Sequence, residues 1–300
     1  MNRGGGLDIL VLVCPIHDCL NPVKIAQSGK SVLPSSLRWV MNPCDAFALE
    51  VALAIRDRAT GTRILALSMT PPEGERVLRE SLAAGADEAV RLWDDALEGS
   101  DPYATAKVLA AAIRLFPADL VLAGVRRGDL EEGQVGPMVA EILGIPHVTE
   151  AREIQWQPGE QDLQAVKRAA GHRIRLSCPL PALVTMERGL PLRYPRLRDR
   201  KRANRASIRV LGLAQLGLDP EAAGIAGSLV EIERITPPKP SRRSALAASV
   251  STLSTAARLQ RILSGGVVPG PKESRIHPCR DSASVEKVVD HMIKEKIVIL

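Results

Sequence analysis

Residues 119–143 read DLVLAGVRRGDLEEGQVGPMVAEIL, and this stretch decides the fold class. Residues 119–123 form a short, largely apolar run, which is typical of a strand buried on both faces of a parallel sheet. A glycine-containing loop follows from Gly124 to Gly136. The apolar spacing of residues 134–143 then predicts a helix. Strand, loop and helix in this order are the unit from which parallel α/β sheets are built.

The same order recurs upstream. The apolar runs predict three further buried strands, and the helical stretches alternate with them. Asn42-Pro43 predicts a helix start, because Asn is a favoured N-cap and Pro suits the first helical turn. The predicted strands are 8–13, 63–68 and 88–92, and the further predicted helices are 73–84 and 105–116. This alternation predicts a doubly wound, mostly parallel sheet of the α/β class.

The pattern changes after about residue 145. Residues 163–168 and 172–176 predict antiparallel strands, and residues 181–185 predict a short buried one. Residues 188–209 hold nine Lys or Arg and a single acid, Asp199. Residues 236–275 are rich in Pro, Ser, Gly and Arg, and this composition favours a linker. We therefore expect four parts, with boundaries at 1–186, 187–235, 236–283 and a terminal helix at 284–300.

Composition excludes several classes of protein. Lys and Arg total 40 against 34 Asp and Glu, a mild excess of +6, and aromatic residues are only 2%, which argues against a base-stacking nucleic-acid surface. The five cysteines are scattered without a CxxC pair, so we expect neither a metal site nor a disulfide framework. No apolar run reaches about 18 residues and no signal segment is visible. These observations predict a cytoplasmic protein without membrane insertion.

The residues alone give a weak binding signal and no catalytic one. The ends of the predicted strands, at Cys14, Met69 and Gly124, are where parallel sheets bind ligands. The 124–136 loop offers glycines and a helix N-terminus to a phosphate, but the GxGxxG and GxxxxGK[ST] fingerprints are absent, so spacing alone favours a plain surface loop. The histidines stand in unrelated contexts, and we interpret Cys14 and Cys44 as small core side chains. We expect no catalysis by side chains.

Several motifs in register carry a family resemblance. They are Met41-Asn-Pro-Cys-Asp45, Leu82-Ala-Ala-Gly-Ala-Asp87, the run Gly124 to Met138 with Val139 to Thr149 after it, Pro181-Ala-Leu-Val-Thr185 and Arg193-Tyr194. Over residues 7–235 the chain resembles the β subunit of electron transfer flavoprotein, the FixA-like family. The resemblance implies a Rossmann-like sheet, similar to adenine nucleotide α-hydrolases, with a C-terminal extended arm. It also implies an electron carrier that pairs with an α subunit and serves flavoprotein dehydrogenases.

The resemblance also implies cofactors and site residues. In this family the redox FAD is held mainly by the α subunit, while the β subunit keeps a nucleotide, usually AMP. The matching positions are Leu12, Asn42, Pro43, Cys44, Asp45, Met69, Gly124, Val125, Arg126, Arg127, Gly128, Asp129, Leu130, Glu131, Glu132, Gly133, Gln134 and Val135. We expect Glu131 and Glu132 to point outward, away from a bound phosphate.

At two places the sequence departs from the family pattern, and these departures leave the identity of the bound nucleotide open. The family loop usually ends Asn-Gln-Thr-Gly, and here Val135 replaces the hydroxyl, which leaves the backbone amides to bind phosphate. Gln134-Val-Gly-Pro137 resembles electron-bifurcating members, which bind a second FAD and NADH, although their preceding Asp-Gly-Asp-Thr-Ala is missing. We favour AMP over the second FAD. Residues 240–280 are longer than the family's usual tail and match nothing in it.

The basic segment 188–209 has three interpretations. Arg193 to Leu197 resembles the loop with which β subunits grip dehydrogenases, which makes Tyr194, Arg196, Leu197 and Arg198 partner-binding residues, with Leu197 as the anchor. A solvated basic face is the plain alternative. A nucleic-acid binder has the charge but lacks aromatic company. For the whole chain, a nucleotide-binding module without redox function is the further alternative.

Overall fold

The chain divides into two units, Met1–Thr236 and Pro237–Leu300. The computed structural model describes residues 6–236 of the first, and residues 254–256, 259, 285–286 and 289–290 of the second. Residues 285–286 and 289–290 are helical. The rest of the predicted terminal helix, and most of the predicted linker 236–283, lie outside the described residues.

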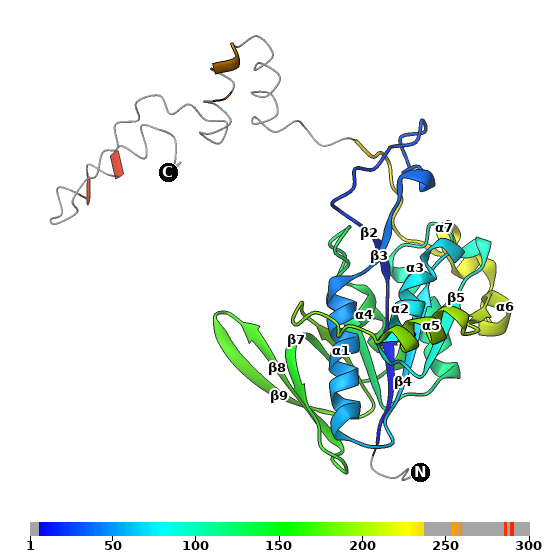
Figure 1. Cartoon of the computed structure of the whole chain (residues 1–300), viewed down its shortest axis with the longest axis vertical. Helices are drawn as coiled ribbons and strands as arrows, with labels where there is room; N and C mark the ends of the chain where they lie inside the picture. The colour runs from blue at the N-terminus through cyan, green and yellow to red at the C-terminus, as the bar shows by residue number, and fades with distance from the viewer. Residues whose placement is uncertain (1–5, 237–253, 257–258, 260–284, 287–288, 291–300) are drawn as a thin grey trace. The chain divides into compact units, whose positions relative to one another are not determined.

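A nine-stranded sheet runs through the first unit (Figure 1), with the strand order β11-β5-β4-β1-β6-β10-β7-β8-β9. The strands from β11 to β7 are paired in parallel, and β8 and β9 add an antiparallel hairpin at one edge. The bounds are β1 Asp8–Leu12, β4 Arg63–Met69, β5 Glu88–Leu92, β6 Leu120–Gly124, β7 His147–Gln155, β8 Asp162–Ala169, β9 His172–Pro179, β10 Ala182–Met186 and β11 Arg209–Leu211. The predicted mostly parallel sheet is confirmed.

Helices cover both faces of this sheet, because successive side chains of a buried strand point to opposite faces. Ile9 and Val11 of β1 lie in the core shared with Leu53 of α1, whereas Leu10 and Leu12 lie in the core shared with α3 and α4. The helices on the first face are α1 (Pro43–Arg58) and α2 (Arg76–Ala84), and those on the second are α3 (Pro102–Leu115) and α4 (Val135–Leu143). The sheet is therefore doubly wound, as predicted.

Several smaller elements complete the described part. β2 and β3 form an antiparallel pair just before α1. The remaining bounds are β2 Pro15–His17, β3 Trp39–Met41, α5 Leu197–Arg205, α6 Leu213–Leu216, α7 Gly224–Gly227, and the 3₁₀ turns Pro34–Ser36, Pro72–Gly74, Asp95–Leu97 and Pro220–Ala222. Among the helices of the described ranges, none is long and apolar enough to cross a membrane.

Besides the short elements β2, β3, β11, α6 and α7, which the sequence did not predict, two elements differ from the sequence-based expectation. β7 was not predicted, because only Val148 and Ala151 of its nine residues are buried, and its register shifts near Ala151, where the neighbouring strands change from parallel to antiparallel pairing. The basic segment was expected to be a loop and arm, yet residues 197–205 form helix α5. A helix there is physically favourable, because Leu, Arg, Lys and Ala are good helix formers.

Candidate functional site

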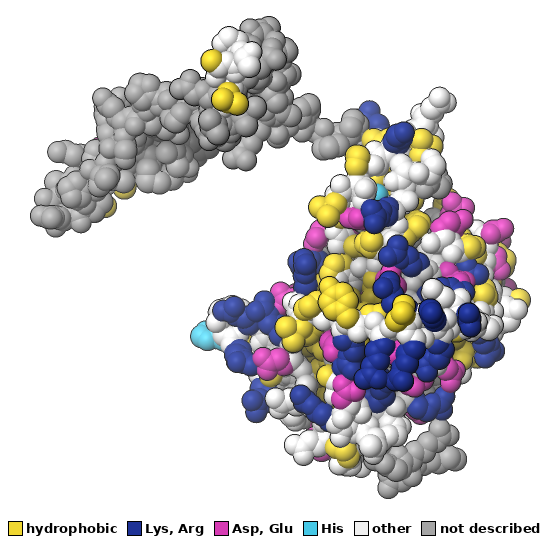
Figure 2. Space-filling view, viewed as in Figure 1, with side chains coloured by type: hydrophobic (Ala, Val, Ile, Leu, Met, Phe, Trp, Pro, Cys, Tyr) yellow, Lys and Arg dark blue, Asp and Glu magenta, His cyan; other side chains and the backbone are white. Residues whose placement is uncertain are grey.

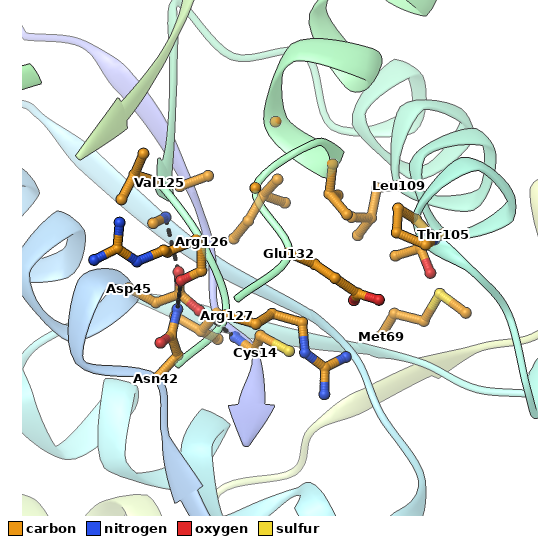
Figure 3. Close-up of a pocket in the computed structure, with 18 of the residues that line it drawn as sticks. Cys14, Asn42, Asp45, Met69, Thr105, Leu109, Val125, Arg126, Arg127 and Glu132 are labelled. Atoms are coloured by element: carbon orange, nitrogen blue, oxygen red, sulfur yellow. Dashed lines mark hydrogen bonds between the residues drawn. The ribbon is translucent and has the colours of Figure 1, made fainter. Parts of the chain in front are cut away.

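A pocket lies at the carboxyl ends of three neighbouring strands, β4, β1 and β6 (Figure 3). Eleven of the predicted positions line it, namely Leu12, Asn42, Asp45, Met69, Gly124, Val125, Arg126, Arg127, Glu132, Gly133 and Val135. The other predicted positions do not line it, namely Pro43, Cys44, Gly128, Asp129, Leu130, Glu131 and Gln134. The fold therefore brings residues 12, 42–45, 69 and 124–135 into one region of the molecule.

Sequence reasoning missed part of the lining. Ser100, Pro102, Thr105 and Leu109 come from the start of α3 and the loop before it. Leu67 and Ala123 were missed as well, whereas Val13, Cys14 and Gly136 belong to the strand end and the loop that the sequence had indicated. The signal for α3 was available, because a helix that follows one strand of a doubly wound sheet begins near the carboxyl end of that strand.

Asp45 connects the three elements that build the pocket. Its side chain is buried in α1, where Oδ2 accepts the backbone N–H of Cys14 at 2.7 Å and Oδ1 accepts that of Gly124 at 2.7 Å. Burial raises the pKa of the Asp45 carboxyl to about 7, although these two N–H groups and the Asn42 amide offset part of the rise. A Cβ at Gly124 would lie 2.2 Å from Asp45 Oδ1, so this contact requires glycine.

Asn42 holds the next part of the loop. Its Nδ2 donates to the carbonyl of Arg126 at 2.9 Å, and its Oδ1 accepts the N–H of Gly128 at 3.2 Å. Asn42 stands at the N-cap of α1 as predicted, but its side chain makes no capping hydrogen bond. The amide is used to fix the loop instead of the helix end. Asn42 and Asp45 therefore position residues 124–128 relative to α1 and β1.

Charged residues line the pocket or pair with residues that line it. Arg127 forms a bidentate pair with Asp129, with Nε–Oδ1 and Nη2–Oδ2 distances both of 3.0 Å. Burial alone would raise the pKa of Asp129, but Arg127 and the N–H of His17 hold it below its usual value. Burial raises the pKa of the Cys14 thiol to about 12, which keeps it protonated at neutral pH and unreactive.

The two adjacent glutamates behave differently. Glu131 is exposed and pairs with Arg126 at 2.7 Å, as expected of an outward side chain. Glu132 was expected to point outward as well, and this is wrong. Its side chain lies in the same space as Met69, Thr105 and Leu109 (Figure 3), and burial raises the pKa of its carboxyl. The loop turns back between the two residues, since Arg127 donates its N–H to the Glu132 carbonyl at 2.9 Å.

The start of α4 supplies unpaired donors. No protein acceptor in the described ranges receives the N–H groups of Gly133, Gln134, Val135 and Gly136. Such amides, with the positive end of a helix dipole behind them, are the usual protein donors to phosphate. Gly133 and Gly136 leave little room for a side chain, because a Cβ would lie 2.8 Å from Val125 O and 2.5 Å from Thr185 Cγ2 respectively. The backbone here fits an anion.

Comparison with known proteins agrees with this architecture. A family model described as "Electron transfer flavoprotein domain" matches residues 31–215. The chain belongs to the electron transfer flavoprotein family, in its β-subunit branch. The electron transfer flavoprotein subunit beta of Thermoanaerobacterium thermosaccharolyticum is 36% identical over 240 residues, which is 79% of this chain and 90% of the relative.

Two further relatives of this electron transfer flavoprotein β chain carry different names. Subunit CarD of the caffeyl-CoA reductase-Etf complex of Acetobacterium woodii is 35% identical over 236 residues, which is 77% of this chain and 88% of the relative. Protein FixA of Azotobacter vinelandii is 33% identical over 225 residues, which is 73% of this chain and 80% of the relative. The resemblance read from the sequence motifs is confirmed, and membership of this family makes the chain an electron-transfer subunit of a flavoprotein.

The segment predicted to meet partners lies apart from the pocket on α5 and the loop before it. Tyr194 and Leu197 are 98% and 70% exposed. Arg196 and Arg198 are exposed beside them, and the Arg198 pair with Asp199 is loose, at 3.8 Å. The loop itself is held, because Arg193 contacts Glu50 at 2.8 Å and Asp57 at 2.9 Å on α1.

Proposed function

We propose that this chain is the β subunit of a heterodimeric electron transfer flavoprotein that carries electrons between flavoprotein dehydrogenases and a downstream acceptor. The redox FAD is held mainly by the α subunit, and AMP occupies the pocket of this chain. The observation that carries the AMP assignment is the set of unpaired amides from Gly133 to Gly136, which border a pocket at the carboxyl ends of β4, β1 and β6. This is where open α/β sheets bind nucleotides.

The lining divides into regions that suit the parts of AMP. The amides at the start of α4 would hold the phosphate. Leu12, Met69 and Leu109 give apolar surface for the base, and the Glu132 carboxylate is available to ribose hydroxyls, as acidic residues are in other dinucleotide-binding sheets. Val135 supplies no hydroxyl, so the backbone alone would meet the phosphate.

A second FAD is the alternative occupant, as in bifurcating members of the family, which also bind NADH. The CarD relative and the Gln134-Val-Gly-Pro137 motif favour it. The acidic side chain of Glu132 inside the pocket favours the ligand with a single phosphate group, because a second phosphate would add negative charge near this carboxyl. We therefore place AMP ahead of FAD.

In this proposal the chain's own residues bind the nucleotide and position the loop 124–128, and none of them takes part in a chemical step. FAD supplies the electron chemistry when it is bound. Asp45 and Asn42 hold the loop, and the protonated Cys14 thiol offers no nucleophile at neutral pH.

We also propose that residues 1–186 form the nucleotide domain and that residues 187–235 contact the α subunit and the dehydrogenases. The proposed location is the cytoplasm. Tyr194, Arg196, Leu197 and Arg198 are the proposed dehydrogenase contacts.

Co-expression with the α subunit tests this function. The purified pair is denatured, and the released nucleotides are identified and counted by chromatography and mass spectrometry. One FAD and one AMP per heterodimer are expected. Two FAD per heterodimer would replace the AMP assignment with the bifurcating one. A β chain that purifies alone, fully yellow and reducible, would contradict the division of cofactors. A pair that holds AMP and no flavin would support a nucleotide-binding module without redox function.

A further inference from the structure

A second hollow lies on the face of the molecule that carries α5, and it has no lining residue in common with the nucleotide pocket. It is an open groove of about 530 Å³ between α2 and the segment 192–204. Its apolar lining includes Ala83 and Ala84 of α2 with Leu192 and Pro195. Arg76, Arg79, Glu80, Arg193, Tyr194, Arg200 and Asn204 form the rest. The groove adjoins the exposed Tyr194.

The walls of this groove are fixed by two arginines that are already engaged. Arg79 Nη1 donates to the carbonyls of Ala203 and Asn204 at 2.9 and 3.0 Å, and its Nη2 donates to Glu75 at 2.7 Å. These contacts tie α2 to the carboxyl end of α5. Arg193 ties the loop before α5 to α1 through Glu50 and Asp57. The groove is therefore formed before any partner arrives, which lowers the entropic cost of binding.

One cation on the groove remains available. Arg76 is paired with Glu80 at 2.7 Å, whereas Arg200 is exposed and its guanidinium has no ion-pair partner among the described residues. α5 carries five basic residues, Arg200 among them, and one acid, Asp199. Lys and Arg side chains gather on this face of the molecule (Figure 2). An apolar groove with a free guanidinium on its wall fits an apolar side chain next to a carboxylate.

We propose that this groove accepts an apolar side chain from an acidic segment of a protein partner, with Arg200 pairing the adjacent carboxylate. The dehydrogenase interface would then have two reciprocal parts, with Leu197 inserted into the partner and a partner side chain inserted between α2 and α5. Charge complementarity selects an acidic protein, and the apolar lining distinguishes it from nucleic acid, which would use the basic face without the hollow. The inference rests on the proposed function only in taking a protein as the partner.

The test measures binding of two labelled acidic peptides to the purified α/β heterodimer by fluorescence polarisation at low salt. In one peptide a central leucine is flanked by glutamates, and in the other serine replaces the leucine. Burial of the leucine should make the first peptide bind about tenfold more tightly. Equal binding of the two peptides would overturn the proposal.

Matched variants locate the contact. Arg200→Glu should weaken binding of the leucine peptide about tenfold, because it reverses the charge on the groove wall. Lys201→Glu makes the same charge change on the neighbouring residue of α5, which does not line the groove, and should weaken binding by less than about threefold. Asn204→Trp, at an exposed position, should fill the groove and remove the preference for leucine. Equal effects of Arg200→Glu and Lys201→Glu would show nonspecific charge attraction and contradict the groove.

Two controls separate this inference from the proposed function. Duplex DNA is titrated beside the peptides, and tighter binding of DNA than of the leucine peptide would overturn the proposal in favour of nucleic acid. Flavin absorbance and released nucleotide are measured on the same samples. A heterodimer without flavin that still prefers the leucine peptide would contradict the proposed function and support the groove.

Discussion

The carboxylate of Asp45 lies 2.7 Å from the backbone nitrogen of Gly124, and its second oxygen lies 2.7 Å from that of Cys14. Asp45 is in the first turn of α1, Gly124 ends β6, and Cys14 follows β1. One buried side chain therefore sets the spacing of two strand ends at the pocket. Above about pH 7, where the Asp45 carboxyl is ionised, it suits both contacts, because both of its oxygens then accept and neither donates.

Asp45→Asn should destabilise the protein and release nucleotide. The amide keeps one acceptor but turns an NH₂ group toward a backbone N–H, which leaves a buried donor unpaired at a cost of about 1–3 kcal/mol. Thermal unfolding and the AMP content of the heterodimer measure the two effects. Asp57→Asn, at the exposed end of the same helix, is the control and should leave nucleotide content unchanged. Full nucleotide content in a folded Asp45→Asn protein would exclude the positioning role.

Stability should depend on pH through Asp45. The folded state holds the proton of this carboxyl up to about pH 7, whereas the unfolded chain loses it near pH 4. Between these values the native state binds more protons, so this group's contribution to the free energy of unfolding falls as pH rises. Urea unfolding at pH 5 and pH 7 should show a smaller fall in Asp45→Asn than in the unmodified chain. Asp129, whose pKa is lowered, acts in the opposite direction at more acidic pH.

Gly133→Val should lower nucleotide retention. A Cβ at this position would lie 2.8 Å from Val125 O, so the loop must move and the amides at the start of α4 lose their arrangement. Gln134→Ala is the matched control, because it keeps the backbone amide and changes a side chain that does not line the pocket. Released AMP per heterodimer is the measurement, with circular dichroism to establish folding. Equal AMP in both folded variants would exclude this loop as the phosphate site.

Leu197→Ala should slow electron transfer to or from a partner dehydrogenase and leave flavin content intact. The side chain is 70% exposed and carries no core packing that the substitution would remove, so stability should change little. Truncating an anchor of this kind typically costs 2 kcal/mol or more in binding, roughly a thirtyfold loss of affinity. Stopped-flow transfer rates with the reduced dehydrogenase measure it. Normal rates in Leu197→Ala would reject the anchor.

Charge reversal at Arg196 and Arg198 should mainly lower the association rate. These exposed cations steer an acidic partner over a distance and form no buried contact, so the dissociation rate should stay close to that of the unmodified chain. The loss should shrink as salt rises, because mobile ions screen exposed charges. Association rates measured at low and high ionic strength give the comparison. A loss that is independent of salt would contradict steering.

The sequence was informative where local chemistry decides the structure. Short apolar runs predicted the parallel strands β1, β4, β5, β6 and β10. The glycines of residues 124–136 predicted the loop, because close backbone packing requires them at Gly124 and Gly133. The sequence was uninformative where a contact between residues far apart in the chain decides the placement of a side chain. Asn42 is a cap by its position, yet its amide binds the loop 84 residues away. Glu132 points into the pocket because the loop folds back and Arg127 donates its N–H to the Glu132 carbonyl. No local sequence pattern predicts this turn. β7 was missed because its neighbours bury few of its side chains.

The strand order has a consequence for how such a protein can change over time. The proposed nucleotide pocket lies at β4, β1 and β6 in the middle of the sheet, whereas α5 packs on α2 beside the edge formed by β5 and β11. The pocket and the groove have no lining residue in common, so we expect the effects of substitutions in them on stability to be close to additive. If α5 and its groove contact the electron donor as proposed, selection for a new donor can redesign them while the proposed nucleotide site stays unchanged. The architecture makes partner choice and cofactor retention separately evolvable properties of one chain.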